Sequence, residues 1–422
     1  MTAIHVRPRA ISGKVRCPSS KSHTLRAILF GGLADGTSYV RNALPSPDTD
    51  AMIVAVRALG ATIEEENGIL RIHGRGRSRS LRSSYIDAGN SGQVLRFVAA
   101  AAALSSTPIE LSGDQSLQTR RLCQPLLDAL QQRGAKAYSV NGNGHAPIRI
   151  QGPIEPGAIE MEGQDSQPVS AMLIACSLLP GVSQIHIRNP GETPWLALTL
   201  DWLRRFGVRY ERDGWDAITV WGQESFPAFD YSVPGDLSSL LFPLVAGLCT
   251  HSDLRIENVD VDDVQGDKVV LEILQQMGAQ FTVDKEQKTI AVKGPQLLQG
   301  CKIDINDCID ALPILAALGT FAQGETLLYN AAVARYKESD RIDAMTRELT
   351  KMGAKIEQSS DSLHITHSLL KAAHLHSCED HRVALALTVA ALGADGESTI
   401  EGVSCVRKSY PTFFEDILGH GK

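Results

Sequence analysis

The chain has 422 residues, 43% of them apolar and 21% charged, which is the composition of a globular protein with room for two or three domains. Its formal net charge of −7 argues against a nucleic-acid partner. The longest apolar stretch, from Phe97 to Leu104, is far shorter than the roughly 18 residues of a membrane span, and the N-terminus lacks an apolar signal segment. We therefore expect a cytoplasmic protein.

The predicted elements begin with two short strands, at residues 4–6 and 14–16, which the pattern favours as a hairpin. From residue 19 onward one order recurs: a helix with a polar start and an apolar body, a strand, a second helix and a hairpin. A glycine follows the second helix of five successive units at intervals of about 70 residues, a position typical of a left-handed helix stop. These glycines are Gly60, Gly134, Gly207, Gly278 and Gly353.

A sixth second helix, at residues 411–418, has no hairpin after it. The repeat is therefore offset along the chain, and we expect the N-terminal strands to complete the C-terminal unit. The period is longer than the roughly 20 to 50 residues of solenoid repeats, so each unit resembles a small α/β subdomain.

Several polar patterns are assigned no binding role. The basic run of Arg75, Arg77, Arg79 and Arg82 is interpreted as a solvated hairpin, because the chain as a whole is acidic. The histidines at 364, 367, 374 and 376 lack acidic or cysteine ligands in register, so we predict no metal site. The eight cysteines include no Cys-x-x-Cys pair, which is typical of buried thiols in a reducing compartment.

The candidate chemistry lies at the helix starts. The inner helices are almost wholly apolar, as at residues 97–104 and 383–392, and should be buried on all sides. Their polar starts are ordinary caps when taken singly, but lysine and arginine are unfavourable at the positive end of a helix dipole. Cations that recur there indicate a substrate with several negative charges. The cations are Lys21, Arg26, Arg121, Lys337, Arg341, Arg382 and Lys408.

The same residues resemble a known family. The stretch Pro18-Ser-Ser-Lys-Ser-His-Thr-Leu-Arg26 is similar to the first signature of the 5-enolpyruvylshikimate-3-phosphate synthases, which are enolpyruvyl transferases. The stretch Gly89-Asn-Ser-Gly-Gln-Val-Leu-Arg96 resembles their glycine loop. Further similar motifs follow in the family's order, so the resemblance runs from residue 18 to residue 411. They are Ser166-Gln167, Pro234-Gly-Asp-x-Ser-Ser239, Ile309-Asp310, Lys337-Glu-Ser-Asp-Arg341, Asp380-His-Arg382 and Arg407-Lys-Ser-Tyr-Pro411.

The resemblance implies an α/β fold of the inside-out barrel type, with six β-α-β-α-β-β repeats in two pseudo-threefold domains. Residues 1–18 and 235–422 would form a discontinuous domain, joined from both termini, and residues 19–234 an inserted domain of three repeats. The active site would lie in the cleft between them. The resemblance also implies a monomer without cofactor or metal.

The implied reaction moves the enolpyruvyl group of phosphoenolpyruvate to the 5-hydroxyl of shikimate 3-phosphate and releases phosphate, on the shikimate pathway to chorismate and the aromatic amino acids. By motif position the catalytic residues would be Lys21, Asp310 and Glu338, with Asp310 as base and Glu338 as acid. Residues that would bind shikimate 3-phosphate are Lys21, Ser22, Arg26, Ser166, Gln167, Asp310 and Lys337. Residues that would bind phosphoenolpyruvate are Lys21, Gly92, Arg121, Gln167, Arg341, Arg382 and Lys408. Glyphosate, an inhibitor in this family, would occupy the phosphoenolpyruvate site.

This chain departs from the family's pattern at several positions. Gln93 replaces a threonine and Phe97 a common proline, while Asp165 and Glu192 fall where one branch has phosphate-binding serines. A carboxylate beside a phosphate repels it unless a cation neutralises the carboxylate.

Two alternatives remain open. One is the sister enzyme that acts on UDP-N-acetylglucosamine, which has Lys-Asn in its first motif and a reactive cysteine on a glycine-rich loop. This chain has Lys21-Ser22 there, and Cys123 without such a loop. The other is a non-catalytic homologue that binds anions, which the presence of Lys21, Asp310 and Glu338 disfavours.

Overall fold

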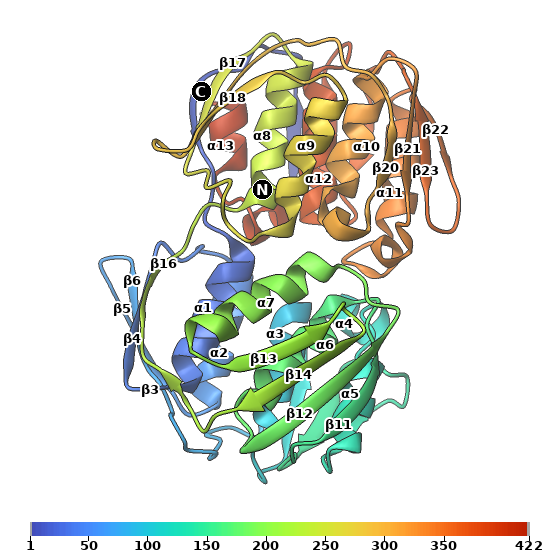
Figure 1. The fold of residues 1–422 in the computed structure, drawn as a ribbon. Helices are drawn as coiled ribbons and strands as arrows, with labels where there is room; N and C mark the ends of the chain where they lie inside the picture. The colour runs from blue at the N-terminus through green and yellow to red at the C-terminus, as the bar shows by residue number, and fades with distance from the viewer. Residues whose placement is uncertain (1, 420–422) are drawn as a thin grey trace. The chain divides into compact units, whose positions relative to one another are not determined.

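The computed structural model describes residues 2–419 and divides into two compact units (Figure 1). Met1–Ser19 and Pro234–Lys422 form one, called here the discontinuous unit, and Ser20–Val233 form the other, the continuous unit. The chain crosses from one unit to the other after Ser19 and again after Val233. Among residues 2–419, no helix has both the length and the apolar character needed to cross a membrane.

The continuous unit alternates strands with helices along the chain. Its helices are α1 (Lys21–Leu33), α2 (Pro47–Ala58), α3 (Gly92–Ala102), α4 (Gln115–Thr119), α5 (Gln124–Gln132), α6 (Ser166–Cys176) and α7 (Thr193–Arg205). Its strands are β3 (Ala34–Asp35), β4 (Thr37–Arg41), β5 (Thr62–Glu66), β6 (Ile69–His73), β7 (Tyr85–Asp87), β8 (Ile109–Ser112), β9 (Lys136–Ser139), β10 (Ile148–Gln151), β11 (Ala158–Glu162), β12 (Gly181–Arg188), β13 (Arg209–Asp213), β14 (Ala217–Gly222), β15 (Phe226–Pro227) and β16 (Asp230–Ser232).

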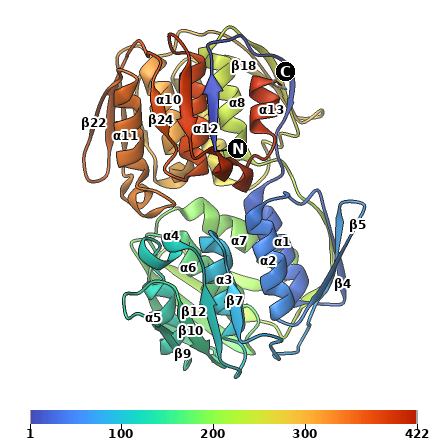
Figure 2. The ribbon, with the colours of Figure 1, turned by 180° about the vertical axis from the view of Figure 1, so that it is seen from behind.

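Three four-stranded sheets of this unit share one topology, with orders β16-β4-β6-β5, β7-β8-β10-β9 and β11-β12-β14-β13. In each sheet an edge strand pairs in parallel with the strand that follows the inner helix, and an antiparallel hairpin completes the sheet. Figure 2 shows the second of these sheets, in which β7, β9 and β10 are labelled, and α3 contacts its strands β8 and β10. Repetition of this pattern agrees with the repeat seen in the sequence.

The discontinuous unit contains helices α8 (Leu237–Cys249), α9 (Val269–Gln276), α10 (Leu312–Phe321), α11 (Arg341–Lys351), α12 (His381–Leu392) and α13 (Phe413–Leu418). Four 3₁₀ turns precede or follow them: η1 (Gly266–Lys268), η2 (Asn306–Ala311), η3 (Ala332–Tyr336) and η4 (Val403–Lys408). Its strands are β1 (Ala3–Val6), β2 (Ser12–Arg16), β17 (Asp253–Glu257), β18 (Phe281–Asp284), β19 (Thr289–Lys293), β20 (Lys302–Asp304), β21 (Glu325–Tyr329), β22 (Lys355–Gln358), β23 (Leu363–Thr366), β24 (His374–His376) and β25 (Ser398–Glu401).

The N-terminal strands join two different sheets of this unit. Strand β1 pairs antiparallel with β25, with Ile4 opposite Ile400, so it completes the C-terminal repeat as expected. Strand β2 instead pairs in parallel with β17, with Lys14 opposite Arg255. The predicted hairpin of these two strands is therefore wrong. Residues 7–11 between them form no turn and lack the Asn-Gly or Asp-Gly pairs that favour tight hairpins.

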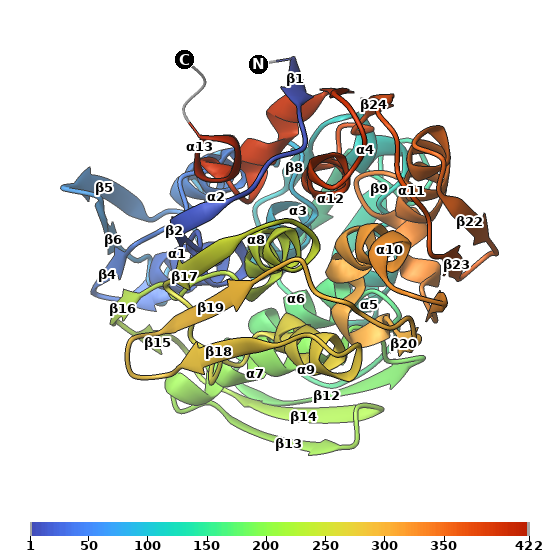
Figure 3. The same ribbon diagram turned by 90° about the horizontal axis from the view of Figure 1, so that it is seen from above.

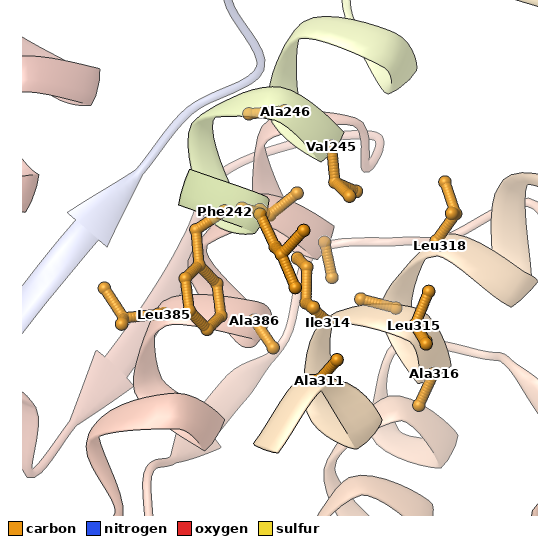
Figure 4. Close-up of a cluster of buried hydrophobic side chains, with 14 of the residues drawn as sticks. Phe242, Val245, Ala246, Ala311, Ile314, Leu315, Ala316, Leu318, Leu385 and Ala386 are labelled. Carbon is orange, nitrogen blue, oxygen red and sulfur yellow. The ribbon is translucent and has the colours of Figure 1, made fainter. Parts of the chain in front are cut away.

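The inner helices form the centre of each unit, with the sheets outside. Every residue of α3 and of α12 is buried, whereas strands such as β12 alternate between buried and exposed side chains. Figure 3 shows α8, α10 and α12 side by side, with β17 to β19 outside α8. In the close-up, Phe242 from α8, Ile314 from α10 and Leu385 from α12 belong to one hydrophobic cluster (Figure 4). The arrangement confirms the predicted inside-out α/β fold.

The five repeat glycines have the predicted backbone conformation. Their φ angles lie between 75° and 114°, in the region that side chains disfavour, and each follows the end of an outer helix.

The basic run after β6 differs from the prediction of a solvated hairpin. Arg75 is buried, and its guanidinium donates to the carbonyl oxygens of Leu59 (3.3 Å) and Ala101 (3.2 Å), near the ends of α2 and α3. Arg79 donates to Leu178 O (2.9 Å), just beyond α6. Helix C-termini leave carbonyl groups without intrahelical partners and attract cations, so these side chains cap helix ends.

We predict that Arg75→Ala lowers the free energy of unfolding by about 2–4 kcal/mol, because it leaves a cavity and two buried carbonyls without donors. Urea unfolding followed by tryptophan fluorescence measures this, since all four tryptophans lie in the continuous unit. The control is Arg77→Ala, whose exposed side chain pairs with Glu224 and should cost less than about 1 kcal/mol. Equal losses in the two variants would contradict the capping role.

Candidate functional site

Arg341 is the first residue of α11 and is only 1% exposed. Its guanidinium contacts three carboxylates: Nε lies 2.8 Å from Asp380 Oδ2, Nη1 2.7 Å from Asp310 Oδ1, and Nη2 3.1 Å from Glu338 Oε2. The carboxylates come from the start of α12, from η2 and from the segment before α11. Asp380 also caps α12, accepting a hydrogen bond from the Arg382 amide at 2.9 Å.

Two further cations complete this group. Arg382 Nη2 lies 3.0 Å from Asp310 Oδ2, and Lys408 Nζ lies 2.7 Å from Glu338 Oε1. Asp310, Glu338, Arg341, Asp380, Arg382 and Lys408 together are called the arginine–carboxylate cluster. All of them belong to the discontinuous unit, and the sequence predicted five of the six as site residues.

Charge pairing in the cluster determines the ionisation of Asp310 and Arg341. Burial alone would raise the pKa of Asp310, but the charges of Arg382, Arg341 and Lys337 outweigh burial and hold this pKa well below the ordinary value of an aspartate. Burial would likewise lower the pKa of Arg341, but Asp380, Glu338 and Asp310 raise it instead. Asp310 is therefore an ionised carboxylate at neutral pH.

Arg382 has guanidinium N–H groups that are not used in hydrogen bonds within the described part of the chain. Its Nε and Nη1 atoms are buried and have no hydrogen-bond partner within the described part of the chain. Buried donors in folded proteins are almost always paired, so unpaired ones at a predicted anion site indicate that a ligand supplies the acceptors.

A second group, which includes the predicted residues Gly92, Arg121 and Gln167, lies in the continuous unit, where α3 and α6 begin. Arg96 Nη1 donates to Gln167 Oε1 (2.7 Å), and Arg96 Nη2 lies 3.0 Å from Asp165 Oδ2. Arg121 Nη1 donates to the Asn90 carbonyl (3.1 Å) from the turn between α4 and α5, so it does not begin a helix as predicted. Gly92, Arg96, Arg121, Asp165 and Gln167 are called the glycine-loop cluster.

Gly92 allows these side chains to approach the start of α3. A Cβ atom at this position would lie 2.9 Å from Arg96 Nη1, 3.1 Å from Arg121 Nη1 and 3.2 Å from Gln167 Oε1. Contacts that short require the neighbours to move. The absence of a side chain at residue 92 therefore sets where both guanidinium groups lie.

Lys21 begins α1 and its ammonium group faces an acidic partner. Its Nζ lies 3.7 Å from Asp48 Oδ2, which also accepts a hydrogen bond from Ser91 Oγ at 3.0 Å. Asp48 in the first turn of α2 thereby connects the two signature motifs of this unit.

Arg26, predicted to bind substrate, is buried and bonded within the unit. Its Nε and Nη2 atoms donate to Thr199 Oγ1 at 3.1 and 2.9 Å, and Nη1 donates to the Ser22 carbonyl at 3.2 Å. Its guanidinium also stacks over Phe97, 5.0 Å from the ring centroid. Burial lowers the pKa of Arg26 to about 9.

The start of α6 is bonded to two carboxylates. Asp165 Oδ1 accepts from the Gln167 amide (2.9 Å), and Glu192 Oε2 accepts from the Ser166 amide (3.1 Å) and hydroxyl (3.2 Å). Asp165 is neutralised by Arg96, as the sequence required for a phosphate to bind nearby. Glu192 is buried and has a positive φ of 49°, which is uncommon for this residue type.

Sequence reasoning missed Asp48, Arg96 and Asp380 as members of these groups. Arg96 and Asp380 lie inside the recognised family motifs, so the motifs themselves pointed to these two residues. Asp48 follows Ser46-Pro47, and an aspartate is ordinary in the first turn of a helix. The local sequence therefore does not reveal that Asp48 is a partner of Lys21.

We predict that Asp380→Asn lowers the free energy of unfolding of the discontinuous unit by about 3 kcal/mol, because it removes a buried partner of Arg341 while keeping an acceptor for the helix cap. Scanning calorimetry of the full chain measures the loss. Asp343→Asn is the control, since its half-exposed pair with Arg347 should contribute less than about 1 kcal/mol. A change no larger than the control's would contradict the prediction.

Similarity to known proteins covers both groups of residues. Residues 6–417 match the family described as EPSP synthase (3-phosphoshikimate 1-carboxyvinyltransferase). The chain is 44% identical over 418 residues to the 3-phosphoshikimate 1-carboxyvinyltransferase of Chlamydia abortus, covering 98% of this chain and 93% of that one. For the enzyme of Chlamydia pneumoniae the identity is 42% over 420 residues, covering 99% and 93%. The solved EPSP synthase of Acinetobacter baumannii has a TM-score of 0.80 at 29% identity, covering 98% and 97%. This chain therefore belongs to the EPSP synthase family.

Proposed function

We propose that this chain transfers the enolpyruvyl group of phosphoenolpyruvate to the 5-hydroxyl of shikimate 3-phosphate and releases phosphate. Membership of the family and the names of both relatives support this reaction. The observation that connects it to particular residues is the arginine–carboxylate cluster, in which Asp310 and Glu338 contact one guanidinium. Proton transfer and anion binding account for the chemistry, so no cofactor is proposed.

The proposed chemistry is an addition followed by an elimination. The 5-hydroxyl oxygen bonds to the second carbon of phosphoenolpyruvate while its proton passes to Asp310, and Glu338 adds a proton to the methylene carbon. The tetrahedral ketal then loses phosphate, which carries away the proton held by Asp310, as a methyl proton returns to Glu338. This step restores the double bond and regenerates both carboxyl groups. Lys21 would stabilise the ketal through its charge.

The geometry of the cluster suits these roles. The arginines keep Asp310 ionised and hence able to accept a proton. Lys408 Nζ lies 2.7 Å from Glu338, so an ammonium proton is one hydrogen bond away from the proposed acid. Glu338 is paired as a carboxylate and must take up a proton before the first addition, whereas in later cycles the methyl group returns that proton.

Phosphoenolpyruvate brings a carboxylate and a phosphate. We propose that Lys21, Gly92, Arg121, Gln167, Arg341, Arg382 and Lys408 bind them, and planar guanidinium groups suit bidentate contacts with both. For shikimate 3-phosphate we propose Lys21, Ser22, Arg26, Ser166, Gln167, Asp310 and Lys337. These residues come from both units of the chain.

The sister reaction on UDP-N-acetylglucosamine is disfavoured by Cys123. A reactive thiol needs exposure and a lowered pKa. Cys123 is buried at the start of α5, and burial raises its pKa. The test measures phosphate release with both proposed substrates, with each omitted in turn, and with UDP-N-acetylglucosamine as the replacement acceptor. Release with the replacement acceptor would support the sister reaction, and no release under any condition would support a non-catalytic homologue.

We also propose that the enzyme acts as a monomer in the cytoplasm. All eight cysteines are free, which is typical of a reducing compartment.

We predict that Asp310→Asn and Glu338→Gln each lower kcat by about 10²-fold or more, because general acids and bases supply factors of that size. Shikimate 3-phosphate should still bind, as measured by calorimetric titration. Glu325→Gln is the control and should retain full activity, since this side chain is 67% exposed and pairs with His364 at the surface. Turnover within a few-fold of the parent in both site variants would remove them from the mechanism.

We predict that glyphosate competes with phosphoenolpyruvate and that Gly92→Ala weakens the inhibitor more than the substrate. The added methyl group would push the guanidinium ends of Arg96 and Arg121 away from the start of α3 and so weaken their contacts with the inhibitor. Glyphosate is the longer molecule and should lose more. The inhibition constant and the KM for phosphoenolpyruvate, measured on the same variant, give the comparison. Equal increases in the two constants would show that Gly92 does not border the inhibitor.

A further inference from the structure

The start of α6 receives a carboxylate from a neighbouring helix. Glu192 directly precedes α7, and its Oε2 accepts hydrogen bonds from the Ser166 amide (3.1 Å) and the Ser166 hydroxyl (3.2 Å). Glu192 is only 2% exposed. Ser166 is the first residue of α6, where the amide groups of the first turn and the helix dipole favour an anion. Glu192 therefore supplies an anion to this position from within the chain.

The contact is not required to cap either helix. Asp165 already caps α6 by accepting a hydrogen bond from the Gln167 amide at 2.9 Å. The side chain of a residue that directly precedes a helix commonly accepts from that helix, but in the described part of the chain Glu192 makes no such cap to α7. Its carboxylate reaches across to Ser166, which lies 26 positions away in the sequence.

The backbone around Glu192 is held in a conformation that allows this contact. Glu192 has a φ of 49°, in the left-handed region that glutamate rarely adopts. The Gly191 amide donates to the Gly163 carbonyl at 3.0 Å, and a Cβ atom at residue 191 would lie 2.6 Å from the Gln164 carbonyl oxygen. This close approach brings the residue after Gly191 to the start of α6. Strained residues that the surrounding structure holds in this way are concentrated at ligand-binding and switch positions.

We propose that Glu192 is a specificity-determining residue for the acceptor, because it competes with the phosphate of the acceptor for the two donors of Ser166. This inference rests on the proposed binding of shikimate 3-phosphate by Ser166. The amide and the hydroxyl each have one hydrogen to donate, and both are given to Glu192 in this structure. A phosphate oxygen that uses these donors must take the place of the carboxylate.

The competition lowers the affinity for a phosphorylated acceptor. Binding of the phosphate breaks two hydrogen bonds of Glu192, and a carboxylate that stays nearby repels the phosphate. Shikimate, the same acceptor without its phosphate, leaves the contact between Glu192 and Ser166 in place. Removal of the carboxylate should therefore strengthen the binding of shikimate 3-phosphate and leave the binding of shikimate nearly unchanged.

The test is calorimetric titration of the full chain with each of these two ligands. Glu192→Gln keeps the shape of the side chain without its charge, and should bind shikimate 3-phosphate about tenfold more tightly than the parent, with the affinity for shikimate within about twofold. The control is Glu160→Gln, which removes the same charge from an exposed position on β11 and should match the parent for both ligands. Unchanged or weaker binding of shikimate 3-phosphate by Glu192→Gln would overturn the proposal, as would an equal gain for both ligands.

A double-mutant cycle tests whether Glu192 acts through Ser166. Ser166→Ala removes one of the two shared donors, so in that background the gain from Glu192→Gln should fall from about tenfold to about threefold. A gain of the same size in both backgrounds would show that the charge of Glu192 acts from a distance, and the proposed competition would be wrong.

Glu192→Gly serves if Glu192→Gln does not fold. Glycine adopts a φ of 49° without strain and has no carboxylate, so this variant should also bind shikimate 3-phosphate more tightly than the parent. The absence of a gain in this variant would equally overturn the proposal.

The same titrations separate this inference from the proposed function. Binding of shikimate 3-phosphate to the parent, without a gain in the Glu192 variants, would refute the role of Glu192 alone. If neither the parent nor the Glu192 variants bound shikimate 3-phosphate, this compound would not be the acceptor, and both the proposed function and the inference would fail.

Discussion

A buried guanidinium must be neutralised where it lies, and in this protein Arg341 meets that requirement with three carboxylates from three segments. Each segment belongs to the start of a helix, and those starts are set by the repeats of the discontinuous unit. The ion pairs therefore hold neighbouring repeats in register. Two of the carboxylates are also the proposed acid and base, so stability and chemistry depend on the same contacts.

The same principle operates in the continuous unit. Lys21 faces Asp48, and Arg96 faces Asp165, although each cation lies near the positive end of a helix. Carboxylates of the chain thus occupy positions where an anionic ligand would be favourable. An electrostatic environment built in this way exists before substrates arrive, and little reorganisation is needed when an incoming anion replaces a side-chain partner.

The repeating architecture was predictable because it has local signals, namely a glycine after each outer helix and an apolar body in each inner helix. The pairing of strands was harder to predict from the sequence. The pairing of β2 with β17, rather than with β1, joins residues more than two hundred positions apart and leaves no local mark. Motifs at helix starts led to most of the candidate site residues, whereas Asp48 acquires its surroundings only through tertiary packing. Arg75 was misjudged because a basic run in an acidic chain resembles solvated surface until helix ends are brought to it.

The pairing of β1 with β25 has a consequence for biosynthesis. Ribosomes make proteins from the N-terminus, and domains generally fold as units while synthesis continues. The continuous unit has its whole sequence in one stretch and can fold once residue 233 has emerged. Strand β1 is made first but finds its partner only when residues 398–401 appear, almost at the end of translation. Throughout that interval the nascent chain carries an unpaired strand edge, which is the kind of surface that chaperones cover and that promotes aggregation.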